Sequence, residues 1–187
     1  MTTKSRIEPA WVPLAALPHR RDDGVDLLLA EAARMLQSAE LDVIGYVQRK
    51  EEIPGQYDPD RHLEDVTTGE RIVISQSLGS GSKACRLDPQ GLTDATQRML
   101  TRMESGADVL VLNRFGHGEL EGGGFRSVIE RAVSDDMPAL IAVGERYRQA
   151  WEDFSADLSV FLSADRRSVR AWCRTVIARC IQRRETS

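Results

Sequence analysis

Short apolar stretches recur along this chain and alternate with longer segments whose apolar residues keep helical spacing. Apolar runs of strand length are expected where a strand is buried on both faces, and apolar residues three or four positions apart form one face of a helix. The predicted strands are residues 11–17, 43–47, 107–112, 138–143 and 158–162. The predicted helices are residues 27–39, 89–104, 125–133, 147–154 and 165–183.

This alternation predicts a three-layer α/β fold with a mostly parallel sheet. Because a helix separates the first two strands, we expect a right-handed parallel crossover between them. The near-continuous apolar stretch 107–112 is expected at the centre of the sheet. Residues 64–67 and 71–75 flank turn-forming residues at 68–70, which predicts a β-hairpin insertion.

The chain divides into three parts. Residues 1–10 are a polar leader, 11–163 are one α/β domain, and 164–187 are a basic amphipathic helix expected to pack on that domain or on a partner. Asp26 and Asp165 precede helical patterns, and both are expected to be N-caps.

The overall charge restricts the partners of the protein. The chain has 187 residues, 41% of them hydrophobic and 29% charged, and a formal net charge of -4. A general nucleic-acid binder would carry a basic surplus, so nucleic acid is not an expected partner. No stretch approaches the roughly 18 apolar residues that a membrane span requires, so no membrane partner is expected either.

The cysteines and histidines predict neither a disulfide framework nor a metal site. Three cysteines, an odd number, are widely separated along the chain, and the three histidines have no metal-ligand spacing. A reducing, cytoplasmic location fits this usage best. Cys85 lies near serines and arginines without a base partner, and we expect it to be a buried apolar residue rather than a catalytic thiol.

Several short motifs together resemble a known family. They are residues 44–48 (IGYVQ), 65–69 (DVTTG), 74–82 (ISQSLGSGS), 85–88 (CRLD), 112–116 (LNRFG) and 124–126 (GFR). With the order of predicted elements, they resemble the small P-loop nucleoside triphosphatases and, more closely, a bacterial family called domain of unknown function 2478. The resemblance covers about residues 12–162 and implies a P-loop-like fold with a β-hairpin insertion.

The first loop departs from the pattern of the active triphosphatases. In that class it reads G-x-x-x-x-G-K-[ST], which wraps phosphates in backbone N–H groups and adds a lysine and a magnesium-binding hydroxyl. Here residues 18–26 read PHRRDDGVD, with one glycine, no lysine and no hydroxyl. Either His19, Arg20 and Arg21 supply the missing positive charge, or this loop is a solvated turn.

The end of the central strand departs as well. The resemblance implies an Asp-Glu pair there to hold magnesium and orient water, whereas this chain has Asn113 and Arg114. Neither side chain binds a divalent cation well. In open parallel sheets ligands bind beyond the carboxyl ends of the strands, so these two residues are expected to contact a ligand or a subunit. The alternative is structural, with Asn113 capping the strand end and Arg114 paired with a neighbouring carboxylate such as Glu119 or Glu121.

A second group of candidates could hold an anion. Hydroxyls, flexible glycine N–H groups, a lysine and arginines with a planar fork all suit phosphate or a similar oxyanion. The predicted ligand-binding residues are Ser75, Ser77, Ser80, Gly81, Ser82, Lys83, Arg86, Asn113, Arg114 and Arg126. The alternative for the serine-rich part, residues 75–83, is a solvent-exposed hairpin loop.

The leading hypothesis is a binding protein for a nucleotide or a small phosphate-like or molybdate-like oxyanion, without efficient triphosphate hydrolysis. Molybdate enters only through the family resemblance, because genes of that family lie near molybdenum-related functions. A second hypothesis is a nucleoside triphosphatase in which Lys83 contributes the charge and Asp22, Asp23 or Asp26 holds magnesium with the nucleotide. A third is an interaction module that forms a homodimer through the C-terminal helix.

Overall fold

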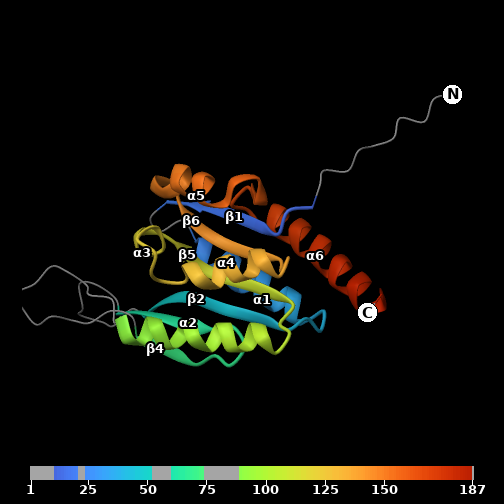
Figure 1. Ribbon diagram of the computed structural model, residues 1–187, viewed down its shortest axis with the longest axis horizontal. Helices are drawn as coiled ribbons and strands as arrows, with labels where there is room; N and C mark the ends of the chain where they lie inside the picture. The colour runs from blue at the N-terminus through green and yellow to red at the C-terminus, as the bar shows by residue number, and fades with distance from the viewer. Residues whose placement is uncertain (1–10, 21–23, 52–59, 74–88, 187) are drawn as a thin grey trace, which may run out of the picture.

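The computed structural model describes residues 11–20, 24–51, 60–73 and 89–186 of the chain. These residues form a seven-stranded sheet in the order β4-β3-β2-β5-β6-β1-β7 (Figure 1). The strands are β1 (Leu14–His19), β2 (Val43–Glu51), β3 (Asp60–Asp65), β4 (Arg71–Val73), β5 (Val109–Phe115), β6 (Ala139–Gly144) and β7 (Ser159–Phe161). Strands β2, β5, β6, β1 and β7 pair in parallel, which confirms the predicted α/β class.

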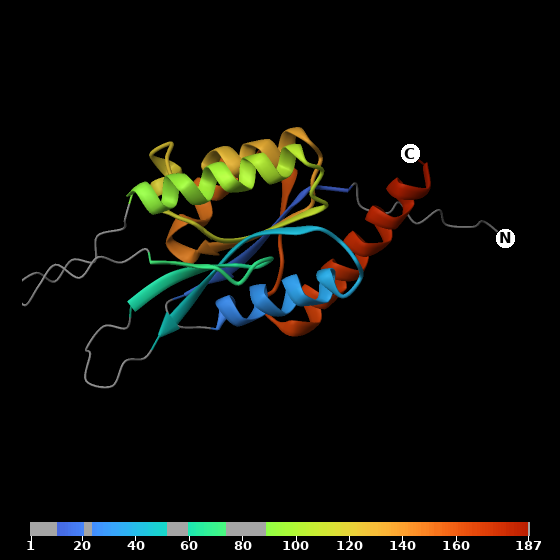
Figure 2. The ribbon, with the colours of Figure 1, turned by 90° about the horizontal axis from the view of Figure 1, so that it is seen from below.

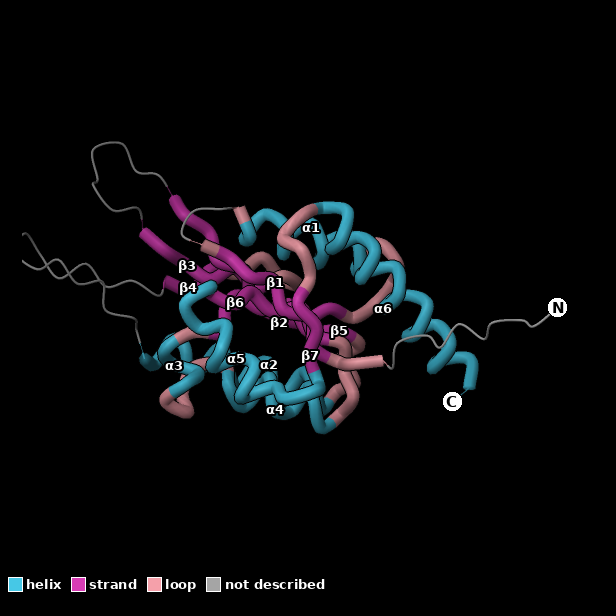
Figure 3. The backbone as a smooth tube through the Cα atoms, turned by 90° about the horizontal axis from the view of Figure 1, so that it is seen from above, coloured by secondary structure: helices cyan, strands magenta, loops and turns pink. Residues whose placement is uncertain are grey.

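Helices cover both faces of the sheet. They are α1 (Val25–Gln37), α2 (Pro89–Glu104), α3 (His117–Leu120), α4 (Arg126–Ser134), α5 (Arg148–Ser155) and α6 (Arg166–Thr186), with 3₁₀ turns η2 (Glu145–Tyr147) and η3 (Ala156–Leu158). Figures 2 and 3 show α1 and α6 on one face and α2, α4 and α5 on the other. The result is the three-layer arrangement predicted from the sequence.

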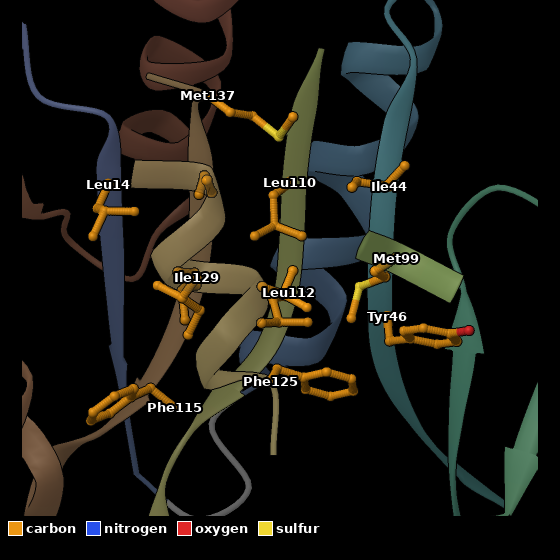
Figure 4. Packing of buried hydrophobic residues seen from close by; sticks show 14 of the residues in the cluster. Leu14, Ile44, Tyr46, Met99, Leu110, Leu112, Phe115, Phe125, Ile129 and Met137 are labelled. Carbon is orange, nitrogen blue, oxygen red and sulfur yellow. The ribbon is translucent and has the colours of Figure 1, made fainter. Parts of the chain in front are cut away.

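Two apolar cores separate these layers. Side chains of the strands alternate between the faces, so Leu110 and Leu112 join the core under α2 and α4, whereas Val109 and Val111 join the core under α1 and α6. Figure 4 shows the first core, where Leu112 lies among side chains from neighbouring strands and from the covering helices. Strand β5 is buried on both faces, as its continuous apolar run predicts.

The predicted hairpin forms an edge of the sheet. Strands β3 and β4 pair antiparallel, and β3 pairs antiparallel with β2. The turn between them is closed by Asp65, whose carboxylate accepts hydrogen bonds from the backbone N–H groups of Thr67 and Thr68 at 2.7 and 3.1 Å. Asp65, Thr67 and Gly69 belong to the DVTTG motif, so this motif has a structural role in the turn.

The C-terminal helix α6 packs against α1. Trp172, Cys173 and Val176 are buried in the core shared with α1, and the Arg166 guanidinium pairs with Glu31 of α1 at 2.7 Å. Burial raises the pKa of the Cys173 thiol to about 11, so this thiol is protonated and unreactive at neutral pH. Within the described residues, no helix combines the length and apolarity that crossing a membrane would need.

Two local expectations from the sequence were incomplete or wrong. The short helix α3 was not predicted, because four residues interrupted by a glycine leave no periodic pattern. Asp26 is not the N-cap of α1. The cap is Gly24, whose left-handed conformation (φ 77°) lets the chain turn into a helix that begins at Val25. Asp165, by contrast, caps α6 by accepting a hydrogen bond from the Ser168 N–H at 2.8 Å.

Gly45 explains part of the IGYVQ motif. It lies in β2 at φ 139°, beside Val111 of β5, and a Cβ atom there would overlap the Val111 carbonyl oxygen. Any side chain would therefore force the two central strands apart. A glycine is required at this position by both its backbone conformation and the close approach of β5.

Replacing Gly45 by Ala should lower the free energy of unfolding by about 3 kcal/mol, because overpacking and an unfavourable φ act together. Gly69→Ala is the matched control: Gly69 also has a positive φ, 71°, but a Cβ there meets nothing within 4 Å. Its cost should be about 1 kcal/mol. Urea unfolding followed by circular dichroism measures both, and equal losses would contradict the predicted clash with β5.

Candidate functional site

Strands β1, β5 and β6 are parallel neighbours, so their carboxyl ends meet at one edge of the sheet. A hollow of about 540 Å³ opens at this edge. Its lining residues all follow or end one of these three strands, and they are His19, Arg20, Arg114, Phe115, Gly144, Glu145, Arg146 and Tyr147. This is the region in which open α/β sheets bind ligands.

The junction between β1 and α1 fixes the register of the first loop. In G-x-x-x-x-G-K-[ST] the helix starts directly after the second glycine. Here α1 starts after Gly24, so His19 takes the position of the first glycine, Val25 that of the lysine and Asp26 that of the hydroxyl residue. Val25 is 4% exposed and belongs to the core, so its position supplies no charge to a ligand.

Strand β5 carries an irregularity at the hollow. Asn113 pairs with Ala142 and Phe115 with Val143, so Arg114 is an extra residue in the ladder between β5 and β6. The peptide bond between Asn113 and Arg114 is cis. Asn113 and Phe115 are both buried, whereas the Arg114 side chain is 36% exposed and lines the hollow. Bulges of this kind redirect side chains next to binding sites.

Asp26, Asn113 and Arg114 form one polar cluster. The Asn113 side-chain amide donates to Asp26 Oδ1, and Arg114 Nε donates to Asn113 Oδ1 at 2.9 Å. The distance from Arg114 Nη2 to Asp26 Oδ1 is 4.0 Å. Burial raises the pKa of Asp26 above its ordinary value, and the Arg114 charge and the Asn113 hydrogen bond offset this only in part.

The side chains of this cluster do not suit a magnesium ion. The fold class places Mg²⁺ between the loop hydroxyl and a strand-end aspartate, which correspond to Asp26 and Asn113. Here Asp26 Oδ1 and Asn113 Oδ1 each accept a hydrogen bond from an N–H donor, and the Arg114 guanidinium brings a fixed positive charge. Within residues 11–20, 24–51, 60–73 and 89–186, no three His, Cys, Asp or Glu side chains gather to hold a metal.

His19 has one unsatisfied ring nitrogen beside the hollow. The residue is 8% exposed, and its Nδ1 lies 3.1 Å from the Arg20 carbonyl oxygen. A carbonyl only accepts hydrogen bonds, so Nδ1 carries the proton and Nε2 is an acceptor in the neutral ring. Nε2 is buried near Gly144 and has no hydrogen-bond partner among the described residues. A buried polar atom of this kind calls for a partner.

Arg146 and Tyr147 form an aromatic wall. The Arg146 guanidinium lies 4.7 Å from the centre of the Tyr147 ring. Tyr147 also packs against the backbone of Gly144, where an added Cβ would come within 3.2 Å of the ring. The stacked pair presents a planar cationic surface next to Arg114.

Arg126 lies apart from this hollow. Its guanidinium pairs with Glu130 at 2.8 Å, stacks on Phe154 at 4.7 Å and donates to the Glu119 carbonyl at 3.3 Å. Arg126 does not line the hollow that Arg114 lines. Of the predicted ligand residues, Asn113 and Arg114 therefore lie in one polar cluster, whereas Arg126 lies apart from it at the start of α4.

Glu119 is not the partner of Arg114. Its buried carboxylate accepts hydrogen bonds from the backbone N–H groups of Gly116 and Phe125 at 2.9 and 3.0 Å. It thus closes the loop between β5 and α4, and Gly124 leaves the space that the carboxylate fills. Glu121 pairs with His117 at 3.4 Å. Neither of the two glutamates pairs with Arg114, and the neighbouring carboxylate beside its guanidinium is instead that of Asp26, at 4.0 Å.

The remaining predicted ligand residues fall within 74–88, outside the described residues. They are Ser75, Ser77, Ser80, Gly81, Ser82, Lys83 and Arg86, and their role stays a prediction.

Arg146 and Tyr147 were not among the residues predicted from the sequence. Their position is of the kind that identified Asn113 and Arg114, because they follow the buried strand β6 just as Asn113 and Arg114 lie at the end of the buried strand β5.

Replacing Asp26 by Asn tests the electrostatics of the cluster. Because the pKa of Asp26 is raised in the folded state, that state binds more protons than the unfolded chain just above the ordinary value of 3.8. Stability from this group is full below that pH and is lost as pH rises. The variant lacks this loss, so its stability relative to the natural chain should increase from acidic to neutral pH.

The control is Asp165→Asn. Hydrogen bonds from Ser168, backbone first, lower the pKa of Asp165, so this carboxylate adds stability as pH rises and the variant should lose ground over the same range. Urea unfolding at a series of pH values measures both. A parallel trend in the two variants would contradict the assignment for Asp26.

Comparison with known proteins gives one family, one curated relative and one solved structure. The family described as "Protein of unknown function (DUF2478)" matches residues 14–172. A molybdenum import ATP-binding protein, ModC 2 of Bradyrhizobium diazoefficiens, is 34% identical over 181 residues, or 97% of this chain. The chain spans only 20% of that relative's length.

The solved structure is that of a human cancer-related nucleoside triphosphatase. Its TM-score is 0.61 at 14% identity, over 90% of this chain and 96% of that one. At this identity the likeness concerns the fold, and it confirms the predicted P-loop nucleoside triphosphatase type of architecture. Since the family match runs from β1 into α6, this chain belongs to the DUF2478 family.

Proposed function

We propose that this chain is a binding protein for a nucleotide or a small oxyanion on a degenerate P-loop scaffold, without efficient triphosphate hydrolysis. The observation that carries the proposal is the hollow at the carboxyl ends of β1, β5 and β6. Among the described residues, its lining includes the arginines Arg20, Arg114 and Arg146 and one acid, Glu145.

The charge of the lining residues is opposite in sign to the net charge of the whole chain. The net charge of the protein is -4, yet the lining residues that the structure describes carry a positive surplus. A concave site with one sign of charge concentrates ligands of the opposite sign. Arginine forks bind phosphate, sulfate and molybdate-like groups through paired N–H donors. An anionic ligand is therefore the class that this hollow favours.

Hydrolysis is disfavoured by the residues at the reacting end of such a ligand. Phosphoryl transfer in this fold class depends on a lysine at the phosphates and on a metal held by an aspartate. The corresponding positions are held by the buried Val25 and by Asn113, whose amide is committed to Asp26. Binding without turnover is the consequence that these replacements support.

The relatives support the choice of ligands to test. The name of ModC 2 includes ATP binding and molybdenum import, and the human structural neighbour is named as a nucleoside triphosphatase. Because this chain corresponds to a fifth of ModC 2, the activity of that whole protein does not carry over. Nucleotides and molybdate both belong in the first screen.

The alternative function is a nucleoside triphosphatase with an unorthodox metal site. One observation favours it, namely that Asp26 takes the metal-binding hydroxyl position at the start of α1. The contacts of Asp26 Oδ1 with the Asn113 amide and the Arg114 guanidinium argue against it, because a cation bound at that oxygen would compete with both.

An anion that binds the hollow should raise the melting temperature of the full chain. A ligand at a hundredfold excess over its Kd stabilises by about 2.7 kcal/mol, which corresponds to about 5 °C or more for a domain of this size. ATP, GTP, phosphate, sulfate and molybdate are the probes. Arg146→Ala should reduce the shift, and Arg167→Ala, an exposed α6 arginine outside the hollow, should not.

A panel without any stabilising anion would contradict the proposed binding function. So would a shift that Arg146→Ala and Arg167→Ala reduce equally, because that pattern indicates nonspecific attraction to surface arginines.

Phosphate release from ATP or GTP with Mg²⁺ should stay at the level of a protein-free control. The reason is that Val25 and Asn113 lack the charge and the carboxylate that the reaction needs. A malachite-green assay measures the release. Metal-dependent turnover that Asp26→Ala abolishes would favour the triphosphatase alternative instead.

A further inference from the structure

We infer that the hollow binds a mononucleotide without a divalent cation, with its phosphate at Arg114 and its base against the Arg146–Tyr147 pair. This inference rests on the proposed anion-binding function and narrows it in two respects. The ligand is a nucleotide rather than a bare oxyanion. Arg114 supplies the positive charge at the phosphate that a bound magnesium ion supplies in other proteins of this fold class.

The size of the hollow favours a nucleotide. Its volume of about 540 Å³ lies within the range of about 300–1,000 Å³ that holds cofactors and drug-sized ligands. A single tetrahedral oxyanion bound at Arg114 would fill a small part of this space and would not reach Tyr147. A ligand with a phosphate at one end and a ring at the other can reach both Arg114 and Tyr147, which line the same hollow.

The chemistry of the wall also favours a base. Aromatic side chains and arginine planes are the surfaces on which nucleic-acid bases stack. The Arg146 guanidinium already lies over the Tyr147 ring, 4.7 Å from its centre, and the ring packs against the backbone of Gly144. An inorganic anion would gain nothing from this aromatic surface.

His19 supplies an independent indication. Its buried Nε2 is an acceptor without a partner in the described part of the chain, and the residue lines the hollow next to Gly144. Sulfate and molybdate carry no proton at neutral pH, so their oxygens only accept hydrogen bonds and do not satisfy this atom in the neutral ring. The hydroxyls of a ribose and the N–H groups of a base donate hydrogen bonds and can satisfy it.

Arg114 makes the site independent of a metal. Asp26 and Asn113, at the two metal-holding positions of the fold, contact each other, and the Asn113 oxygen is turned toward Arg114 Nε. The guanidinium lies 4.0 Å from the Asp26 carboxylate, in the neighbourhood where a magnesium ion would offset the charge of the phosphates. A fixed cation there attracts phosphate directly and repels a divalent cation.

Isothermal titration of the full chain tests the absence of a metal requirement. AMP and GMP are the probes, each titrated in EDTA and in magnesium chloride. We expect the Kd in EDTA and in magnesium to agree within about twofold. Binding that requires magnesium, or that magnesium strengthens tenfold or more, overturns the inference. Failure of every nucleotide and oxyanion under both conditions would instead overturn the proposed function itself.

Two pairs of variants test the assigned contacts. Arg114→Gln keeps a polar side chain but removes the charge, and it should weaken AMP or GMP binding at least tenfold, whereas Arg167→Gln should leave the Kd unchanged. Tyr147→Leu should weaken nucleotide binding severalfold without changing the Kd for pyrophosphate, and Tyr147→Phe should bind as the natural chain does. Melting curves identify any variant that fails to fold.

Equal weakening of nucleotide and pyrophosphate by Tyr147→Leu, in a variant that melts as the natural chain does, would contradict base stacking. Unchanged nucleotide affinity in Arg114→Gln would contradict the role of this guanidinium.

Discussion

Strand β6 lies between β5 and β1 and pairs in parallel with both, and every feature of the candidate site depends on this pairing. It brings His19, Asn113 and Gly144, which are far apart in the sequence, to one edge of the sheet. The pairing is stabilised by burial on both faces, since the central strands carry almost no polar side chain before their last residues. Polar chemistry is thereby confined to the carboxyl ends of the strands.

At that edge, the side chains of Asn113 and Arg114 offset the negative charge of Asp26. Asp26 would be an isolated, partly buried carboxylate at the start of α1 without the Asn113 amide and the Arg114 guanidinium. A buried charge needs such partners because its desolvation is unfavourable. Because of the irregularity in β5, the Arg114 side chain lies beside the Asp26 carboxylate and also lines the hollow. Asn113 and Phe115 stay buried on opposite faces of the sheet.

Several family motifs are explained by packing rather than by ligand binding. Gly45 allows β5 to approach β2, Asp65 closes the turn of the edge hairpin, and Gly124 leaves room for the Glu119 carboxylate. Glu119 in turn holds the loop from Gly116 to Phe125 through two backbone N–H groups. None of these residues lines the hollow, and the carboxylates of Asp65 and Glu119 accept their hydrogen bonds within the protein.

The sequence by itself determined the order and type of most elements, because burial on one or two faces leaves a periodic pattern in the residues. It also identified the end of β5 as a candidate site, since Asn113 and Arg114 directly follow an apolar run. Only the tertiary structure decided that Arg114 faces Asp26 rather than Glu119, and that Arg146 and Tyr147 line the same hollow. These facts depend on strand order and on distances between residues remote in sequence, which no local pattern records.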